Sequence, residues 1–387
     1  MGYCGGQHTD FAAKGQTDCF ESQNGVARIH RPLNPPSPFW SKERHADRRP
    51  RLAARAQIAN GLRRHFERQN FVEVEPAILQ ISPGNEAHLH GFATEILAPG
   101  GGAIPAFLHT SPEFAMKKLL AAGEERIFAL SRVFRNRERG ALHSPEFTML
   151  EWYRVGVSYE VLMEDCADII ATAARDAGAE RLRFRGRQAD PFLQPERLRV
   201  RDAFLRHAGI DIFETLPTNG DCPDRDAFAL QVQATGIRIA PDDNWSDIFS
   251  RVLSEKVEPF LGIGRATVLC EYPRSEAALA HASAHDSRVA DRFELYACGV
   301  ELANAFGELT DAREQRRRFE AEMEEKQRVY GETYPLDEDF LAALDYMPGA
   351  SGAALGFDRL VMLACGADRI EDVQWIPVFE PANGSRA

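Results

Sequence analysis

The chain has 387 residues, of which 44% are hydrophobic and 27% charged, a composition typical of a globular protein with one large or two smaller domains. Its formal net charge of −12 argues against a broad nucleic-acid-binding surface, because phosphate contacts need clustered Lys and Arg. The sequence has no apolar run of membrane-spanning length, no signal peptide and no C-x-x-C pair among its seven cysteines. These features predict a soluble cytoplasmic protein with free thiols and without a zinc site.

Residues 1–37 are rich in Gly, Gln, Asn, Ser and Pro, which predicts a disordered N-terminal extension. From Arg51, apolar residues recur at a helical spacing, so an amphipathic helix of about five turns is expected there. The alternating run that begins at Phe71 predicts a strand that ends at Pro76.

A second helix is predicted over Pro112–Ala122, with Thr110 or Ser111 as its cap. The strand-like run Arg126–Val133 then leads into FRNRERGALHSPEFTMLEWYR, which begins as an arginine-rich loop and returns as a second strand. A loop that only turned the chain would favour Gly, Pro, Asn and Asp. Because arginine guanidiniums match the geometry of phosphates, this loop is predicted to bind a polyphosphate.

A third helix is predicted behind Ser158 as its cap. Residues 180–265 contain short helical patterns split by polar, Pro-rich links, and we interpret them as a mainly helical insertion. Strands resume at Ala266 and again over Arg292–Phe306. Strands separated by long connections, with hairpins among them, indicate an α+β fold whose mixed or antiparallel sheet is covered by helices.

Glu294, Glu301 and Glu308 follow one another at intervals of seven residues in RFELYACGVELANAFGEL. On a helix this spacing would form an acidic stripe, but a glycine interrupts the run and its Phe, Leu, Tyr and Val favour strands. A hairpin that turned at Ala297-Cys298 would place Glu294 opposite Glu301, and like charges in that arrangement need a cation between them. Mg²⁺ that also contacts the phosphates of a nucleotide would supply this charge.

The run GASGAALGFDRL predicts a glycine-rich turn that leads into an apolar helix. Gly352 and Gly356 allow the backbone to lie close to a ligand, and Arg359 stands at the start of the helix. The run is neither a P-loop nor a G-x-G-x-x-G dinucleotide turn, so neither of those phosphate-binding folds is indicated.

Together, FRN…HSPEFTMLEWY, GVELANAFGEL and GAALGFDRL resemble three motifs of class II aminoacyl-tRNA synthetases, most closely those of the lysyl branch and in its order. The resemblance implies that residues 38–387 form a class II synthetase-like catalytic domain, an antiparallel sheet flanked by helices, and that the protein is a homodimer. Lysyl-tRNA synthetases also carry an N-terminal anticodon-binding domain, for which this sequence has too few residues before the core. No tRNA partner is therefore expected.

Among proteins with this shorter layout, the sequence resembles the family of elongation factor P (R)-β-lysine ligases. In that family, an enzyme activates (R)-β-lysine with ATP and joins it to a lysine side chain of elongation factor P. Ala354 stands where lysyl-tRNA synthetases have glycine, and the ligases also have alanine there. The resemblance therefore implies a cytoplasmic ligase that uses ATP and Mg²⁺, with (R)-β-lysine and elongation factor P as its partners.

The resemblance also implies roles for residues at matching positions. The ATP-binding set would be Arg135, Asn136, Arg137, Glu138, Ser144, Phe147, Glu301, Leu302, Gly356 and Arg359. Of the catalytic residues Arg135, Arg359 and His143, Arg135 would contact the α-phosphate and His143 the outer phosphates. Phe147 would stack on adenine with Arg359 over its other side, while Glu294 and Glu301 would hold Mg²⁺.

The lysine-binding residues implied in the same way are Ser111, Pro112, Glu113, Glu151, Tyr153, Glu308 and Ala354. Glu113 would bind the amine nearest the substrate carboxylate. Glu151, Tyr153 and Glu308 would enclose the ε-ammonium, because a buried ammonium must be paired.

Two positions depart from the family pattern. Arg137 stands where the family has a glutamate that contacts adenine, and Ser144 stands where it has an asparagine. A shifted loop would let Glu138 replace the glutamate. Two alternatives to the ligase stay open: a truncated lysyl-adenylate-forming paralogue that uses α-lysine, and a non-catalytic paralogue that regulates a partner.

Overall fold

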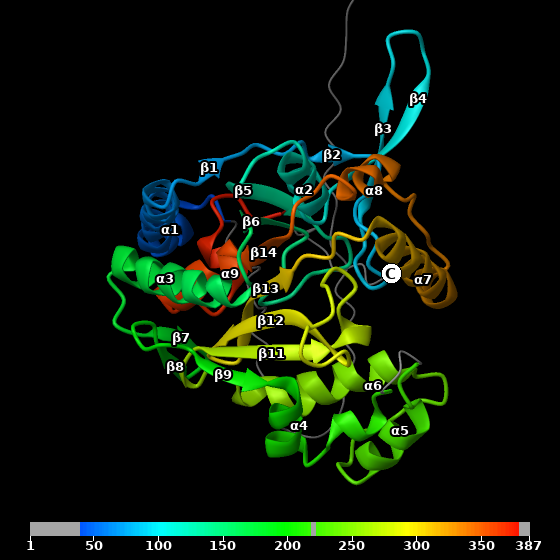
Figure 1. Cartoon of the computed structure of the whole chain (residues 1–387). Helices are drawn as coiled ribbons and strands as arrows, with labels where there is room; N and C mark the ends of the chain where they lie inside the picture. Colours follow the sequence, from blue (N-terminus) through cyan, green and yellow to red (C-terminus); the bar gives the residue numbers. More distant parts are fainter. Residues whose placement is uncertain (1–38, 218–221, 379–387) are drawn as a thin grey trace, which may run out of the picture. The chain divides into compact units, whose positions relative to one another are not determined.

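The computed structural model describes residues 39–217 and 222–378, so the predicted extension of residues 1–37 lies outside the described residues. A mixed eight-stranded sheet with the order β1-β5-β6-β14-β13-β12-β11-β9 forms the centre (Figure 1). Its strands are β1 (Val72–Glu73), β5 (Arg126–Phe134), β6 (Glu146–Val155), β14 (Ala350–Gly356), β13 (Val300–Gly307), β12 (Val289–Ala297), β11 (Thr267–Pro273) and β9 (Glu196–Arg199). Within this sheet, only β1 with β5 and β9 with β11 pair in parallel, which confirms the predicted α+β class with a mostly antiparallel sheet.

Helices α1 (Lys42–Arg68), α3 (Glu160–Ala177) and α9 (Phe357–Cys365) cover one face of the sheet (Figure 1). Side chains alternate between the two faces along a strand, so every second residue of β6 points toward these helices. Leu150 and Trp152 do so, and both are fully buried in the core that the three helices share with the sheet.

Helices α2 (Glu113–Ala121), α7 (Ala312–Tyr330) and α8 (Glu338–Leu344) belong to the other side of the sheet. Their aromatic side chains form a second core, in which the rings of Phe114 and Phe340 stack with their centroids 4.2 Å apart. None of the helices in residues 39–217 and 222–378 is long and apolar enough to cross a membrane.

The segment between β6 and β11 contains helices α4 (Val200–Ala208), α5 (Arg225–Gln233) and α6 (Trp245–Val252). They enclose a separate apolar core and pack against β11 and β12 of the main sheet. The segment also holds the strands β7 (Leu182–Phe184) and β8 (Arg187–Asp190), which form a small sheet with β10 (Gly264–Arg265).

A third sheet consists of β2 (Leu79–Gln80), β4 (Ala103–Leu108) and β3 (Phe92–Leu97). The β3–β4 hairpin projects from the body of the protein (Figure 1). Its outer part is exposed, and several of its apolar side chains face solvent.

Several predicted boundaries were wrong. α1 begins well before Arg51, behind Ser41, whose hydroxyl accepts a hydrogen bond from the amide of Arg44. The cap of α3 is Tyr159 instead of Ser158, and its side chain makes no capping hydrogen bond. The predicted glycine-rich turn is the strand β14, because its residues pair on both sides with β6 and β13.

A buried ion pair joins α1 to the start of α9. Arg55 binds Asp358 through one guanidinium nitrogen and donates to the Thr148 hydroxyl through another, at 2.8 Å. The second Asp358 oxygen accepts a hydrogen bond from the Thr148 amide at 2.9 Å. The ion pair therefore connects both helices to β6, the strand that carries much of the candidate site.

We expect Arg55→Met to lower the free energy of unfolding by about 3–5 kcal/mol, because it leaves the Asp358 carboxylate buried without its cation. The matched control is Arg63→Met on the same helix, whose ion pair with Glu73 is exposed and should contribute about 0–1 kcal/mol. Urea unfolding of both variants measures the difference. Equal losses of unfolding free energy in the two variants would show that the buried ion pair stabilises the fold no more than the exposed one.

Candidate active site

The candidate site lies on the face of the sheet opposite α1, α3 and α9. Its floor comes from alternate residues of neighbouring strands, with Glu151 of β6 paired to Ala354 of β14 and Tyr153 paired to Gly352. A Cβ atom at Gly352 would lie 2.2 Å from the Tyr153 ring and 2.5 Å from Oε1 of Glu308. Only glycine lets these two side chains approach β14 so closely.

The β12–β13 hairpin differs in register from the prediction. It turns at Cys298 and Gly299, both with positive φ, one residue later than expected. Glu294 therefore pairs with Asn304, and Glu301 pairs with Tyr296. A β-bulge at Leu302 then brings Glu301 and Asn304 to the same face although they are three residues apart.

Over this floor lies a cleft of about 300 Å³. The predicted site residues that line it are Arg135, Glu138, His143, Ser144, Phe147, Glu301, Leu302, Ala354, Gly356 and Arg359. They come from the arginine-rich loop, β6, β13, β14 and α9, which are distant in the sequence. The structure thus brings most of the predicted ATP site together.

Arg359 connects three parts of this cleft. Its guanidinium donates to the backbone oxygens of Glu301, at 2.9 Å, and Leu142, at 3.2 Å. It also lies 2.8 Å from Nε2 of His143. Burial, with the charges of Arg359 and Arg135, lowers the pKa of His143, so a neutral imidazole accepts this hydrogen bond.

Arg135 also points into the cleft. Its Nε donates to the backbone oxygen of Thr110 at 3.2 Å, and its guanidinium carbon lies 5.5 Å from the centre of the Phe147 ring. The contact with Thr110 leaves the two terminal nitrogens available for an anion. These nitrogens suit the oxygens of a phosphate.

Asn136 and Arg137 do not line the cleft. Arg137 has a positive φ of 64°, forms an ion pair with Glu332, and lies over the Tyr330 ring at 5.6 Å. The side-chain oxygen of Asn136 accepts a hydrogen bond from the Arg137 amide. The residue that replaces the family glutamate is therefore directed toward the C-terminal end of α7.

A buried polar cluster adjoins the cleft. Glu151 accepts hydrogen bonds of 2.7 Å from the hydroxyls of Ser111 and Tyr153. Burial, with the nearby charge of Glu113, raises the pKa of Glu151 to about 8. The carboxyl group is thus poised to give up its proton when a cation enters.

Lys117 is the cation of this cluster, and the sequence analysis did not include it. Its Nζ lies 2.5 Å from Glu113 and 2.6 Å from Glu308. Burial alone would lower the pKa of Lys117, but the two carboxylates outweigh it and raise the pKa. The i, i+4 spacing of Glu113 and Lys117 on a predicted helix was the available signal. For Glu308, burial has the larger effect and raises the pKa to about 7, although the charge of Lys117 opposes that rise.

Glu294 has its own partners on the same face. Its carboxylate binds Arg292 and accepts hydrogen bonds from the hydroxyls of Tyr272 and Tyr296. Glu301 is the more open of the two predicted metal ligands, and burial together with the charge of Glu294 raises its pKa. Glu301 lines the cleft and Glu294 does not. A divalent cation needs only one or two protein carboxylates when phosphates complete its shell, so Glu301 could hold one there, and Glu294 could join it by giving up one of its present partners. Among the described residues, no larger group of His, Cys, Asp and Glu converges on a metal site.

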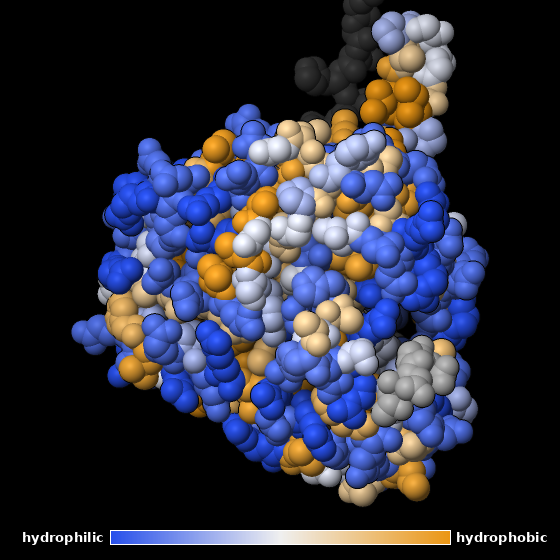
Figure 2. All heavy atoms as spheres, in the orientation of Figure 1, coloured by the Kyte–Doolittle hydropathy of each residue, from blue (hydrophilic) through white to orange (hydrophobic). Residues whose placement is uncertain are grey.

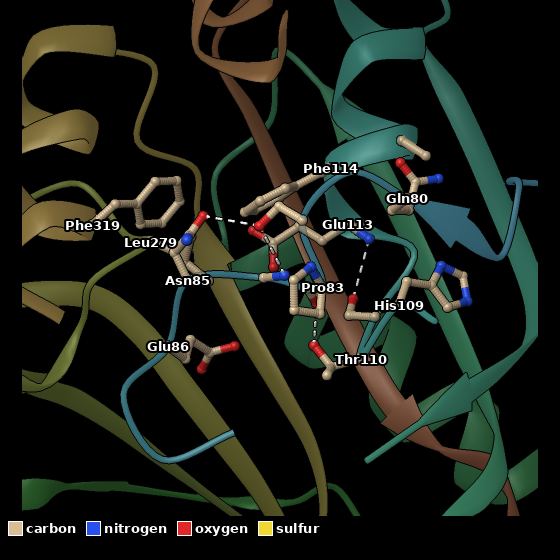
Figure 3. A pocket seen from close by; sticks show the side chains of 14 residues that line it. Gln80, Pro83, Asn85, Glu86, His109, Thr110, Glu113, Phe114, Leu279 and Phe319 are labelled. Carbon is tan, nitrogen blue, oxygen red and sulfur yellow. Dashed lines mark hydrogen bonds between the residues drawn. The ribbon is translucent and has the colours of Figure 1, made fainter. Parts of the chain in front are cut away.

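A second, smaller cavity lies at the start of α2 and shares one lining residue with the cleft (Figure 3). Ser111 and Glu113 line it, as does Glu86, which also lines the cleft. Glu86 was missed in the sequence because its loop, SPGNEAHLH, has no helical or strand-like pattern. Pro112, a predicted substrate-binding residue, is the N-cap of α2 and positions Glu113 at the first turn.

Fold and site agree with the sequence comparisons. Residues 39–380 match the family of tRNA synthetases class II (D, K and N), and the chain belongs to this family of ATP-using, adenylate-forming ligases. The elongation factor P–(R)-β-lysine ligase of Proteus mirabilis is 38% identical over 330 residues, which are 85% of this chain and 95% of that protein. The enzymes of the same name from Sodalis glossinidius and Haemophilus influenzae are 40% and 38% identical, each over 324 residues, 83% of this chain and 93% of theirs. The family resemblance inferred from the motifs is therefore confirmed.

We expect Gly352→Ala to lower the free energy of unfolding by roughly 1–3 kcal/mol, because the new methyl group would overlap Tyr153 and Glu308. The control is Gly356→Ala on the same strand, where the nearest atom, Cδ of Arg359, would be 3.6 Å away. Thermal or urea unfolding should separate the two variants. If both variants are equally stable, the packing of Tyr153 and Glu308 against β14 does not require glycine at position 352.

Proposed function

We propose that the protein activates (R)-β-lysine with ATP and transfers it to the ε-amino group of a lysine of elongation factor P. The observation that carries this proposal is a cluster of three carboxyl groups, Glu113, Glu151 and Glu308, that adjoins the arginine-lined cleft through Ala354, the strand partner of Glu151. A buried carboxylate cluster suits an ammonium group, and paired arginines suit a phosphate. The similarity to the ligases over most of both chains supports the same substrates.

In the first step, the substrate carboxylate attacks the α-phosphorus of ATP, and pyrophosphate leaves with the electrons of the broken bond. Arg135 stabilises the negative charge that develops on the α-phosphate. Phe147 and Arg359 bind the adenine from its two sides, and His143 contacts the outer phosphates. Mg²⁺ held by Glu294 and Glu301 would neutralise phosphate charge.

In the second step, the ε-amine of the acceptor lysine attacks the carbonyl carbon of the adenylate and AMP leaves. No enzyme nucleophile is required, because the bound geometry and charge stabilisation act on both steps. Glu151, Tyr153 and Glu308 hold the substrate ε-ammonium, while Ser111, Pro112 and Glu113 shape the end nearer the carboxylate. Because the acceptor is a translation factor, we place the reaction in the cytoplasm.

ATP–pyrophosphate exchange with the purified protein tests the function. We expect strong exchange with (R)-β-lysine and weak exchange with L-α-lysine, followed by transfer to elongation factor P when it is added. Ala354→Gly should shift the ratio of kcat/KM values toward L-α-lysine, by roughly 10-fold for one methyl group in a packed pocket. Preference of the wild type for L-α-lysine would favour the α-lysine paralogue, and absence of exchange with either isomer would favour a non-catalytic role.

The KM for (R)-β-lysine should fall as the pH rises from about 6 to about 8.5. Glu151 and Glu308 have pKa values of about 8 and about 7, so below these values they are neutral and pair poorly with an ammonium. The ε-ammonium itself stays charged across this range. The control is the KM for ATP measured at the same pH values, and a flat or rising KM for the amino acid would contradict the assigned pocket.

We also propose that the protein is a homodimer whose interface includes β1, β2 and the β3–β4 hairpin. Apolar side chains are exposed there, including Val72, Leu79 and Ile81, and Figure 2 shows apolar atoms at the base of the hairpin. Light scattering should give a dimer for the wild type and a monomer for Leu79→Asp/Ile81→Asp. Leu230→Asp, on exposed α5, should leave the dimer intact. A monomeric wild type would overturn this proposal.

A further inference from the structure

Glu86 stands where the two cavities of the site meet. It belongs to the loop between β2 and β3, and its half-buried side chain lines both the cleft with Arg135 and the smaller cavity with Glu113. In Figure 3 its carboxylate points inward, below Pro83 and toward Thr110. A ligand that occupied both cavities would therefore lie next to this carboxylate.

Glu86 also differs from the carboxyl groups of the predicted lysine pocket in having no bonded partner. Glu113 and Glu308 share Lys117, Glu151 has two hydroxyl donors, and Glu301 contacts Arg359. Within residues 39–217 and 222–378, the Glu86 carboxylate makes neither a hydrogen bond nor an ion pair, although the charge of Arg135 acts on it. A carboxylate kept partly out of water without a partner is costly unless a ligand supplies one.

The charges around Glu86 define the ligand. Burial raises its pKa to about 7, an effect that Arg135 opposes and that Glu113 and Glu322 reinforce. An incoming ammonium would stabilise the ionised form. Because Lys117 brings a single positive charge to Glu113 and Glu308 together, the pocket has more carboxyl groups than cations, and Glu86 adds to that excess at this end.

The reaction geometry then identifies the group that binds. The substrate carboxylate must approach the α-phosphate beside Arg135, and the ε-ammonium would lie in the cluster around Glu151. A second amine close to the carboxylate would lie between these two parts of the site, and Glu86 is the residue that lines both cavities. The resemblance assigns this amine to Glu113, but Lys117 already holds the Glu113 carboxylate at 2.5 Å. We propose that Glu86 binds the 3-ammonium group of (R)-β-lysine and thereby makes the site selective for a diamino acid. This inference rests on the proposed function.

The probe that tests it is 6-aminohexanoate, which keeps the carboxylate and the terminal amine of β-lysine but lacks the second amine. In ATP–pyrophosphate exchange, Glu86→Gln should raise the KM for (R)-β-lysine by roughly 10- to 100-fold, the loss expected for one charged hydrogen bond. The KM for ATP should stay unchanged. The affinity for 6-aminohexanoate, measured as a substrate or as a competitive inhibitor, should also stay unchanged, because this compound has no amine for Glu86 to bind.

The matched control is Glu322→Gln, which removes a nearby negative charge that is already engaged by the amide of Ala87 at 2.8 Å. It should change the KM for (R)-β-lysine by less than about 3-fold, as expected for a longer-range, partly screened charge. An unchanged KM in Glu86→Gln would overturn the inference, as would equal losses for (R)-β-lysine and 6-aminohexanoate, which indicate a structural role. Failure of the wild type to exchange with any lysine isomer would instead refute the proposed function.

Discussion

The burial of several carboxyl groups on one face of a β-sheet is the constraint on which the structure of this site depends. Carboxylates placed so close together repel one another, and each loses hydration that only a cation or a hydrogen-bond donor can replace. Lys117 supplies that cation for Glu113 and Glu308, and Arg292 supplies it for Glu294. Ion pairs as well as apolar contacts therefore fix the positions of the helix α2 and the strands β12 and β13.

The same balance explains how the pocket can accept a substrate. Its internal cations do not compensate all of its carboxyl groups, and burial raises the pKa of Glu151 and Glu308 so that protons fill part of the deficit when no ligand is bound. When an ammonium ligand binds, its positive charge replaces that of the protons, which the carboxyl groups release. The adjoining cleft also presents the guanidiniums of Arg135 and Arg359, so a molecule with an ammonium at one end and a carboxylate near ATP at the other finds a partner for each end.

Part of the site followed directly from sequence patterns. The arginine-rich loop between two strands, the glutamates in and just after the β12–β13 hairpin, and the arginine at the start of α9 were all predicted, because each belongs to a continuous segment whose spacing is informative. Glu86 and Lys117 were not found in this way. Lys117 lies on an amphipathic helix, where its i, i+4 spacing from Glu113 is also common among exposed pairs, and Glu86 lies in a loop without periodicity. Local sequence therefore does not show that either residue is partly buried in a site.

The sequence by itself determined the class of fold, the order of the motifs and the residue types that phosphate and ammonium binding require. Only the tertiary structure decided the register of the β12–β13 hairpin, the bulge that brings Glu301 and Asn304 to one face, and the direction of Arg137 away from the cleft. It also decided which carboxyl groups form ion pairs with lysine or arginine side chains and which do not. These properties depend on contacts between segments far apart in the chain, and local spacing carries no information about the charge that a distant segment will bring.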